Sequence, residues 1–251
     1  MDGTPARVAM WVSQLSAVTF SGDAVLRPTG PDPLRRAVLS VLREAPGAGA
    51  SGDPERAWSG YAASRAGARW GEQREVLLGD LFRGLPAEAL RGAEAAVGDR
   101  LGAALEWQPD ALPALDYLRE SGLSTALILD LPAPLPPAWL ERARPWFDTV
   151  VSSRDLGFRT PAATVFADAV VHMHVPAARV LHVGEGLAED VRGAQRAGLR
   201  AALLERPMRH PQDPQALDWL LRTEGRAAAE VKPDLKIRTL EELAAAIDAF
   251  G

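Results

Sequence analysis

Four acidic residues are placed where carboxylates could do chemistry, each shortly after an apolar run typical of a buried strand. The runs span residues 15–20, 124–129 and 179–183. The acids that follow them are Asp23, Asp130, Glu185 and Asp190. If the runs lie side by side in one sheet, the four carboxylates converge, and crowded carboxylates have raised pKa values or capture a cation such as calcium. The alternative, which we favour, is four acids that are solvated in an open site.

A hydroxyl group could add nucleophilic chemistry to these acids. Ser21 lies two residues before Asp23 and would need a neighbouring base to remove its proton. No histidine is close to Ser21 in the sequence, although His182, on the run 179–183, could approach it in space. Because His182 belongs to a buried strand, we favour a role in core packing for it.

Length and composition indicate an ordinary globular protein. The chain has 251 residues, enough for one or two domains, with 47% hydrophobic and 24% charged residues. Its formal net charge is -5, aromatic residues make up 6%, and it has no run of Lys or Arg, so we expect no nucleic-acid partner.

The absence of cysteine excludes disulfides, thiolate metal sites and a cysteine nucleophile, and it fits a reducing compartment. No apolar stretch approaches the roughly 20 residues of a membrane span. We therefore expect a cytoplasmic protein without a membrane contact, whose partner is an unknown protein or a small-molecule ligand.

Two kinds of pattern divide the chain. Residues 32–106 have Ala, Leu, Arg and Glu at helical spacing and predict three or four helices. After residue 108, helices alternate with short apolar strands, which is typical of a parallel sheet with crossover helices. The expected pairs of helix and strand are 111–120 with 124–129, 137–144 with 149–152, 163–173 with 179–183, and 189–197 with 201–204.

The last part of the chain is less regular. We expect a proline-rich loop at residues 207–214, a helix at 215–230, a short edge strand at 235–237 and a final helix at 240–250. In parallel sheets, ligands bind beyond the carboxyl ends of the strands. The segments expected there are residues 21–23, 130, 157–161 and 184–190.

Three of these segments resemble motifs of the haloacid dehalogenase-like (HAD) hydrolases. Residues 179–198 (RVLHVGEGLAEDVRGAQRAG) resemble the fourth motif, residues 155–166 (DLGFRTPAATVF) the third, and residues 18–26 (VTFSGDAVL) the first. The resemblance implies an α/β fold with a Rossmann-like, doubly wound parallel sheet and an inserted helical cap domain. Residues 1–31 and 108–251 would form the core, and residues 32–107 the cap.

The first motif of this chain differs from the family pattern at the residue that reacts with the substrate. The family has an aspartate nucleophile that also ligates magnesium, and Ser21 takes its position; the second aspartate, a general acid and base, is matched by Asp23. An aspartyl phosphate is a reactive mixed anhydride, whereas a serine phosphate ester is far more inert. We therefore do not expect Ser21 to take over the role of the aspartate nucleophile without other changes in the site.

The phosphate-binding positions depart as well. The second motif places Ser or Thr where this chain has Asp130, and an ionised carboxylate there would repel phosphate. The third motif contributes a lysine where this chain has Thr160. Arg159 is adjacent, but neighbouring residues face different ways. The positive charge that would stabilise a phosphoryl transition state is thus expected to be lost.

The fourth motif keeps two acids, with Glu185 in place of an aspartate and Asp190 as the second acid. Magnesium needs an octahedral shell with ligand distances near about 2.1 Å. The longer Glu185 side chain and the missing carboxylate at Ser21 should weaken such a site. We therefore expect no bound cofactor, with magnesium as a weakened alternative.

Together these departures favour a catalytically inactive family member, a pseudoenzyme that acts as a binding, regulatory or structural subunit. The alternative is a divergent HAD hydrolase of the phosphatase type, acting on a phosphate monoester or a related substrate. In that alternative the active site is rebuilt, and Asp23 or Asp130 serves as nucleophile or base.

Overall fold

The computed structural model describes residues 9–44, 53–71, 73–82, 84–206, 218, 221–225 and 231–250. The expected loop at residues 207–214 lies outside these ranges, and the expected helix at residues 215–230 lies mostly outside them.

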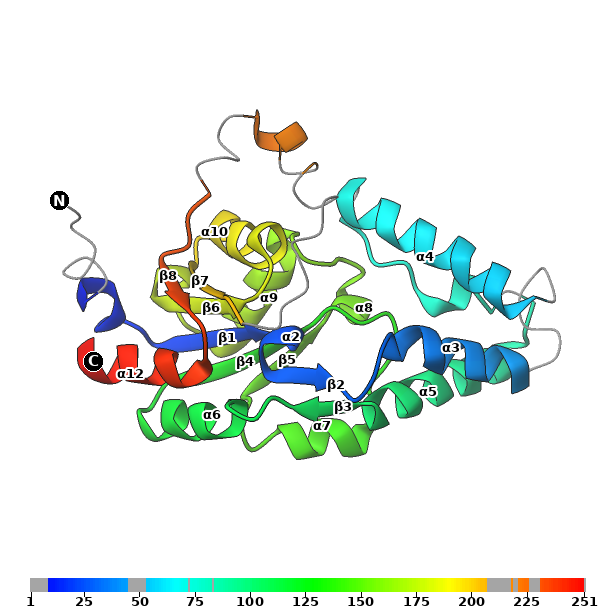
Figure 1. Cartoon of the computed structure of the whole chain (residues 1–251), viewed down its shortest axis with the longest axis horizontal. Helices are drawn as coiled ribbons and strands as arrows, with labels where there is room; N and C mark the ends of the chain where they lie inside the picture. Colours follow the sequence, from blue (N-terminus) through cyan, green and yellow to red (C-terminus); the bar gives the residue numbers. More distant parts are fainter. Residues whose placement is uncertain are drawn as a thin grey trace.

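A six-stranded sheet forms the centre of the molecule, in the order β5-β4-β1-β6-β7-β8 (Figure 1). Each neighbouring pair of strands is parallel. The strands are β1 (Ala17–Ser21), β4 (Ser124–Leu129), β5 (Thr149–Ser152), β6 (Val180–Gly184), β7 (Arg200–Leu204) and β8 (Leu235–Ile237). The sheet confirms the predicted α/β, Rossmann-like fold, and the expected edge strand at 235–237 is present.

Helices cover both faces of the sheet, because the side chains of each strand alternate between the two faces. Val18 and Phe20 of β1 belong to the apolar cluster on one face, while Ala17 belongs to the cluster on the other. Helices α6 (Ala111–Glu120), α7 (Pro137–Ala143) and α12 (Leu240–Phe250) contribute to the first cluster. Helices α9 (Ala163–Met173) and α10 (Gly193–Arg196) contribute to the second.

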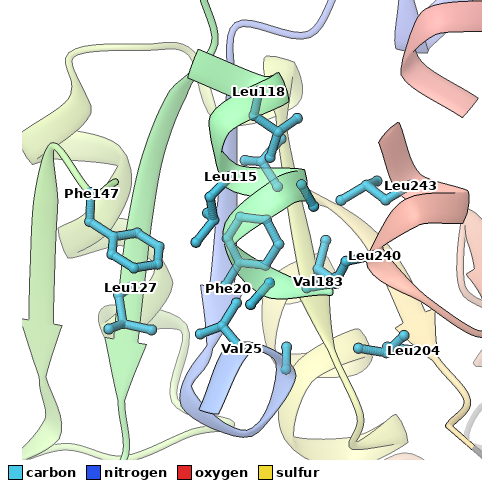
Figure 2. Packing of buried hydrophobic residues seen from close by; sticks show 14 of the residues in the cluster. Phe20, Val25, Leu115, Leu118, Leu127, Phe147, Val183, Leu204, Leu240 and Leu243 are labelled. Atoms are coloured by element: carbon cyan, nitrogen blue, oxygen red, sulfur yellow. The ribbon is translucent and has the colours of Figure 1, made fainter. Parts of the chain in front are cut away.

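The first cluster shows how these elements are held together. Phe20 is fully buried and belongs to the same cluster as Leu115 of α6 and Leu240 of α12 (Figure 2). Burial of a large apolar side chain contributes roughly 1.5–3 kcal/mol to folding. The cluster thereby fixes the position of β1, whose carboxyl end carries the first sequence motif.

Several short elements lie in the connections between the longer ones. They are α2 (Gly22–Val25), α8 (Ser153–Leu156), the 3-10 turns η1 (Leu78–Asp80) and η2 (Ala177–Arg179), and the π-helical turn η3 (Leu187–Arg192). The turn η3 leads into α10, so the single helix expected at residues 189–197 is divided in two.

Three helices between residues 33 and 103 form a group, which we call the helical segment and which extends to one side of the sheet (Figure 1). Its helices are α3 (Pro33–Glu44), α4 (Pro54–Gly71) and α5 (Ala87–Ala103). They pack around an apolar cluster that includes Val38, Tyr61 and Val97. The three helices agree with the helical spacing of the sequence.

The two connections between the sheet and the helical segment pair with each other. Strand β2 (Leu26–Pro28) and strand β3 (Leu105–Trp107) form an antiparallel ribbon, which the sequence did not predict. Each strand has only three residues, too few to show an alternating pattern. Trp107 stacks on Trp139 with ring centroids 5.9 Å apart, and this contact joins the ribbon to α7.

The loop after β4 also contacts the helical segment closely. Ala133 is buried within the apolar cluster of the three helices. Gly98 of α5 lies so close to this loop that a Cβ atom on it would be 1.9 Å from the carbonyl oxygen of Pro134. Glycine is therefore the only residue that fits at position 98 without a shift of the backbone.

The sequence predicts no membrane contact. Within the described part of the chain, no helix has both the length and the apolar character needed to cross a membrane.

Candidate functional site

The carboxyl end of the sheet brings together three of the four acids predicted from the sequence. Asp23 follows β1, Asp130 follows β4, and Asp190 lies in η3 after β6. The charges of Asp130 and Asp190 both act on Asp23. The fourth acid, Glu185, instead forms an ion pair with Arg206, with Oε1 and Nε 3.3 Å apart. The arrangement follows from the parallel sheet, in which the carboxyl ends of strands meet at one edge.

Ser21 is the last residue of β1 and the N-cap of α2. Serine at an N-cap commonly accepts a hydrogen bond from a backbone N–H of the first helical turn, but the Ser21 side chain makes no such bond. Its residue is 9% exposed, and its Oγ atom is buried without a hydrogen-bond partner among the described residues. The hydroxyl group at the nucleophile position is thus not used to hold the fold.

Asp23 has a raised pKa. Burial of the carboxyl group is the largest cause, and the carboxylates of Asp190 and Asp130 raise the pKa further. Arg69 acts in the opposite direction. The residue as a whole is exposed, so the effect of burial is smaller than for an enclosed carboxyl group and the two neighbouring carboxylates carry more of the shift. The direction of the shift holds nevertheless, since two negative neighbours act in the same sense as burial.

Asp130 is an ionised carboxylate held by an arginine. Burial alone would raise its pKa, but Arg159, with smaller contributions from Arg69 and Arg65, lowers the pKa to about 2. Nε and Nη2 of Arg159 donate to Oδ1 and Oδ2 of Asp130, each at 2.9 Å. The expected repulsion between Asp130 and phosphate is therefore offset by a paired positive charge.

Arg159 and Thr160 both contact Asp130, although neighbouring residues were expected to face different ways. The Thr160 hydroxyl donates to Oδ2 of Asp130 at 3.3 Å. Both side chains are nearly buried. The residue at the lysine position and the arginine beside it thus meet at the same carboxylate, because the loop between α8 and α9 turns there.

Two arginines of α4 complete the site, and the sequence analysis did not identify them. Arg65 donates to the backbone carbonyl of Asp130 at 3.0 Å. Arg69 forms an ion pair with Glu189 at 3.3 Å and approaches Oδ2 of Asp130 at 3.9 Å. Their spacing of four residues in an expected helix was a usable signal, because it places both side chains on one face.

Glu75 binds both Arg65 and the first residue of α8. Its side chain is fully buried and accepts hydrogen bonds from Arg65 at 2.8 Å and from the Ser153 hydroxyl at 2.7 Å. Nε of Arg159 lies 3.6 Å from its Oε2. A buried carboxylate needs such partners, since an unpaired charge there would be strongly destabilising.

His182 is fully buried on β6, where its ring nitrogens contact Thr19 at 2.9 Å and Asp190 at 3.3 Å. It lies in the core, as expected, and no hydrogen bond links it to Ser21. Asp190 also accepts a hydrogen bond from the backbone N–H of Gly186 at 2.7 Å. Gly184 leaves room for this carboxylate, because a Cβ atom there would be 2.2 Å from Cγ of Asp190.

The two predicted metal ligands do not fit a magnesium shell. The carboxylate of Glu185 is paired with Arg206, that of Asp190 is bound by Gly186 and His182, and Ser21 offers no carboxylate. In the described ranges, no group of three or more His, Asp and Glu side chains could hold a metal ion. Magnesium prefers several free oxygen ligands in octahedral geometry, and these donors are already engaged.

Comparisons with known proteins agree with the architecture. The family model described as haloacid dehalogenase-like hydrolase matches residues 32–198, and a second HAD-like hydrolase model matches residues 157–243. A HAD phosphatase from Thermococcus onnurineus has a similar structure, with a TM-score of 0.57, 23% identity, and coverage of 92% of this chain and 97% of that one. A 2-haloacid dehalogenase from Pseudomonas syringae pv. Tomato DC3000 has a TM-score of 0.63, 20% identity, and coverage of 94% and 100%.

Two curated relatives are similar in sequence. A ribulose-1,5-bisphosphate 5-phosphatase of Halopiger xanaduensis is 31% identical over 137 residues, which are 54% of this chain and 54% of the relative. A glyceraldehyde 3-phosphate phosphatase of Methanopyrus kandleri is 29% identical over 127 residues, 49% of this chain and 54% of the relative. The chain spans about half the length of the curated relatives that it matches.

These relatives correct one expectation. The changed motif residues indicated a catalytically inactive binding or regulatory protein, but both curated relatives are named as phosphatases, which favours the alternative of a phosphatase-type hydrolase. The prediction of an inactive protein is therefore wrong; the motifs do not show Arg65 and Arg69, which the fold brings to the site. Since the family model matches more than half of the chain and the sheet has the same architecture, the chain belongs to the haloacid dehalogenase-like hydrolases.

Proposed function

We propose that this chain is a phosphatase-type hydrolase that acts on phosphate monoesters, with a rebuilt active site at the carboxyl end of the sheet. The observation that carries the proposal is the position of Asp23, a carboxyl group with a raised pKa on which the positive charge of Arg69 acts. The names of the two curated relatives support the reaction type.

Asp23 serves as general acid and base. A carboxyl group with a raised pKa keeps its proton closer to neutral pH, so it can donate that proton to the leaving oxygen. As a carboxylate it can then accept a proton from water. This matches the position that the second aspartate of the first motif has in the family.

Asp130 is a positioning residue in this proposal. Its pKa of about 2 keeps it ionised at neutral pH, and both of its carboxylate oxygens are bound by Arg159. A carboxylate held in this way is a poor nucleophile and a poor base. Its function is to fix Arg159 and Thr160 at the edge of the site.

The helical segment serves as a cap in this proposal, with residues 32–107 as the cap and residues 1–31 and 108–251 as the core. Support comes from α4, whose Arg65 and Arg69 reach Asp130 and Glu189 of the sheet connections. A cap that contributes charged groups to the site can also exclude water from the reacting phosphate.

Small phosphorylated sugars are the first substrates to test, since the relatives' names contain ribulose bisphosphate and glyceraldehyde phosphate. We infer that magnesium binds weakly at most, because Arg206 holds Glu185. The lack of cysteine supports the reducing cytoplasm as the place of action.

The test is phosphate release from ribulose 1,5-bisphosphate, glyceraldehyde 3-phosphate and p-nitrophenyl phosphate, with and without magnesium. Wild-type protein should release phosphate, and Asp23→Asn should be slower by about 10²–10⁴-fold. Asp155→Asn, which changes an exposed carboxylate on α8, is the matched control and should keep full activity. Absence of phosphate release by the wild type under both conditions, or equal rates for Asp23→Asn, would overturn the proposal.

A further inference from the structure

The hydroxyl group of Ser21 has no role in the folded structure that its surroundings explain. Its Oγ atom is buried and has no hydrogen-bond partner among the described residues. It also does not form the helix-capping hydrogen bond that a serine at the start of α2 could accept. Buried polar groups are nearly always paired, because an unmade hydrogen bond is costly.

Ser21 differs from the other buried polar atoms that lack a hydrogen bond. Those atoms belong to charged side chains that form ion pairs. They are Arg69, Arg154, Glu189, Arg206 and Glu224. Ser21 carries no charge and forms no ion pair, so its hydroxyl is left for a group that binds at the site.

The position of Ser21 in the sheet indicates which kind of group binds to its hydroxyl. It ends β1 at the edge of the sheet and pairs in register with Ile128, two residues before Asp130. Asp23 follows two residues later, in α2. The unpaired hydroxyl thus lies at the same edge of the sheet as the two aspartates of the proposed active site.

We propose that the Ser21 hydroxyl is the nucleophile and that the reaction passes through a phosphoserine at this residue. The inference rests on the proposed phosphatase function and names its covalent step. It requires Ser21 to contact the substrate directly, whereas Arg159 and Thr160 act through Asp130.

In the first step, Oγ of Ser21 forms a bond to phosphorus and the bond from phosphorus to the ester oxygen breaks. The hydroxyl proton moves to a non-bridging oxygen of the phosphate dianion, which serves as the base because His182 is engaged by Thr19 and Asp190. Protonated Asp23 gives its proton to the leaving oxygen. The products are the free alcohol, a serine phosphate and an Asp23 carboxylate.

In the second step, the Asp23 carboxylate takes a proton from water, and the water oxygen attacks phosphorus. The bond from phosphorus to Oγ breaks, and the proton on the phosphoryl oxygen returns to Oγ. Inorganic phosphate leaves, and Ser21 and Asp23 regain their first states. Because a serine phosphate is more inert than an aspartyl phosphate, this step is the slow one and the phosphoserine accumulates.

The experiment follows p-nitrophenyl phosphate with the full chain by rapid mixing and by mass spectrometry of acid-quenched protein. The expected result is a burst of nitrophenol of about one per protein molecule, and one phosphate on the peptide that contains Ser21. That phosphate should resist hydroxylamine, which cleaves acyl phosphates but not serine phosphates.

Two variants separate the role of Ser21 from folding. Ser21→Ala should lose the burst and the bound phosphate, while its free energy of unfolding should equal or exceed that of the wild type, because it removes an unpaired buried hydroxyl. Ser121→Ala, which removes an exposed hydroxyl after α6, is the control and should keep both the burst and the phosphate. Ser21→Asp should carry a phosphate that hydroxylamine removes.

Three outcomes would overturn the inference. A hydroxylamine-labile phosphate on wild-type protein would assign the nucleophile to a carboxylate such as Asp23. Steady turnover with full activity in Ser21→Ala would show that the protein is a phosphatase but that Ser21 is not its nucleophile. If no phosphate ester reacts and no phosphate is found on the protein, both the proposed function and this inference are wrong.

Discussion

Arg159 binds both carboxylate oxygens of Asp130 through two hydrogen bonds of 2.9 Å. The pair joins the loop before α9 to the carboxyl end of β4, and Thr160 donates to the same carboxylate. A two-point bond between guanidinium and carboxylate fixes orientation as well as distance. The pair therefore sets the shape of one side of the proposed active site and ties the stability of the fold to the charge of Asp130.

Asp130 should make the stability of the protein depend on pH under acidic conditions. Its pKa is about 2 in the folded protein, below the ordinary value of 3.8, so its stabilising contribution is complete above pH 4. The contribution, about 2 kcal/mol, is lost as pH falls from about 4 to about 2. Chemical denaturation of the wild type across this range should show the loss, and Asp130→Asn should show a flatter dependence. An equally steep dependence in both proteins would contradict the assignment.

Arg69 should control the pH at which the proposed general acid works. Its positive charge lowers the pKa of Asp23, so Arg69→Met should raise that pKa. A general acid is active while protonated, and the alkaline limb of kcat/KM should therefore move to higher pH. Arg69→Lys keeps the charge and should leave the limb close to its wild-type position. A shift of the limb to lower pH in Arg69→Met would show that Asp23 does not act as the acid.

Gly98 should be needed for the contact between α5 and the loop after β4. Gly98→Ala would place a Cβ atom 1.9 Å from the backbone oxygen of Pro134 and should lower the free energy of unfolding by about 1–3 kcal/mol. Gly92 lies in the same helix with nothing within 4 Å of its Cβ position. Gly92→Ala should raise stability by about 0.5–1 kcal/mol. Urea denaturation measures both, and equal effects would show that the close approach is absent.

Magnesium affinity should depend on the carboxylate missing at Ser21 and on the pairing of Glu185 with Arg206. Ser21→Asp should bind magnesium at least about tenfold more tightly than the wild type, and adding Arg206→Met should strengthen binding again. Calorimetric titration measures the affinities. Glu185→Gln in the Ser21→Asp background should weaken binding. If the wild type already binds magnesium as tightly as Ser21→Asp, the missing carboxylate at position 21 does not limit magnesium affinity.

The strands and helices of the sheet region were predictable from short patterns. Helix 111–120, strand 124–129, strand 149–152, helix 163–173 and helix 240–250 have the expected bounds. Apolar runs of strand length and helical spacing act over neighbouring residues, so they can be read along the chain. The ribbon of β2 and β3 was missed, since its three-residue strands are paired across about 80 residues of helical segment.

The candidate site was predictable only in part. Motif order and the rule for the carboxyl ends of parallel strands place Ser21, Asp23, Asp130 and Asp190 at one edge, and the structure brings them there. The charges that surround them come from another part of the chain, on α4. No local pattern shows that Arg69 acts on Asp23, because that interaction depends on how two distant elements pack.

Residue types and their order along the chain thus determine the kind of sheet, the edge where the site forms, and the absence of an aspartate at the first motif position. Which arginine neutralises which acid follows from the packing of α4 and the Arg159 loop against that edge. Electrostatic energy depends on the distance between charges in space and on the water that is excluded around them. Asp130 consequently has a lowered pKa and Asp23 a raised one, although both are single aspartates that follow a buried strand.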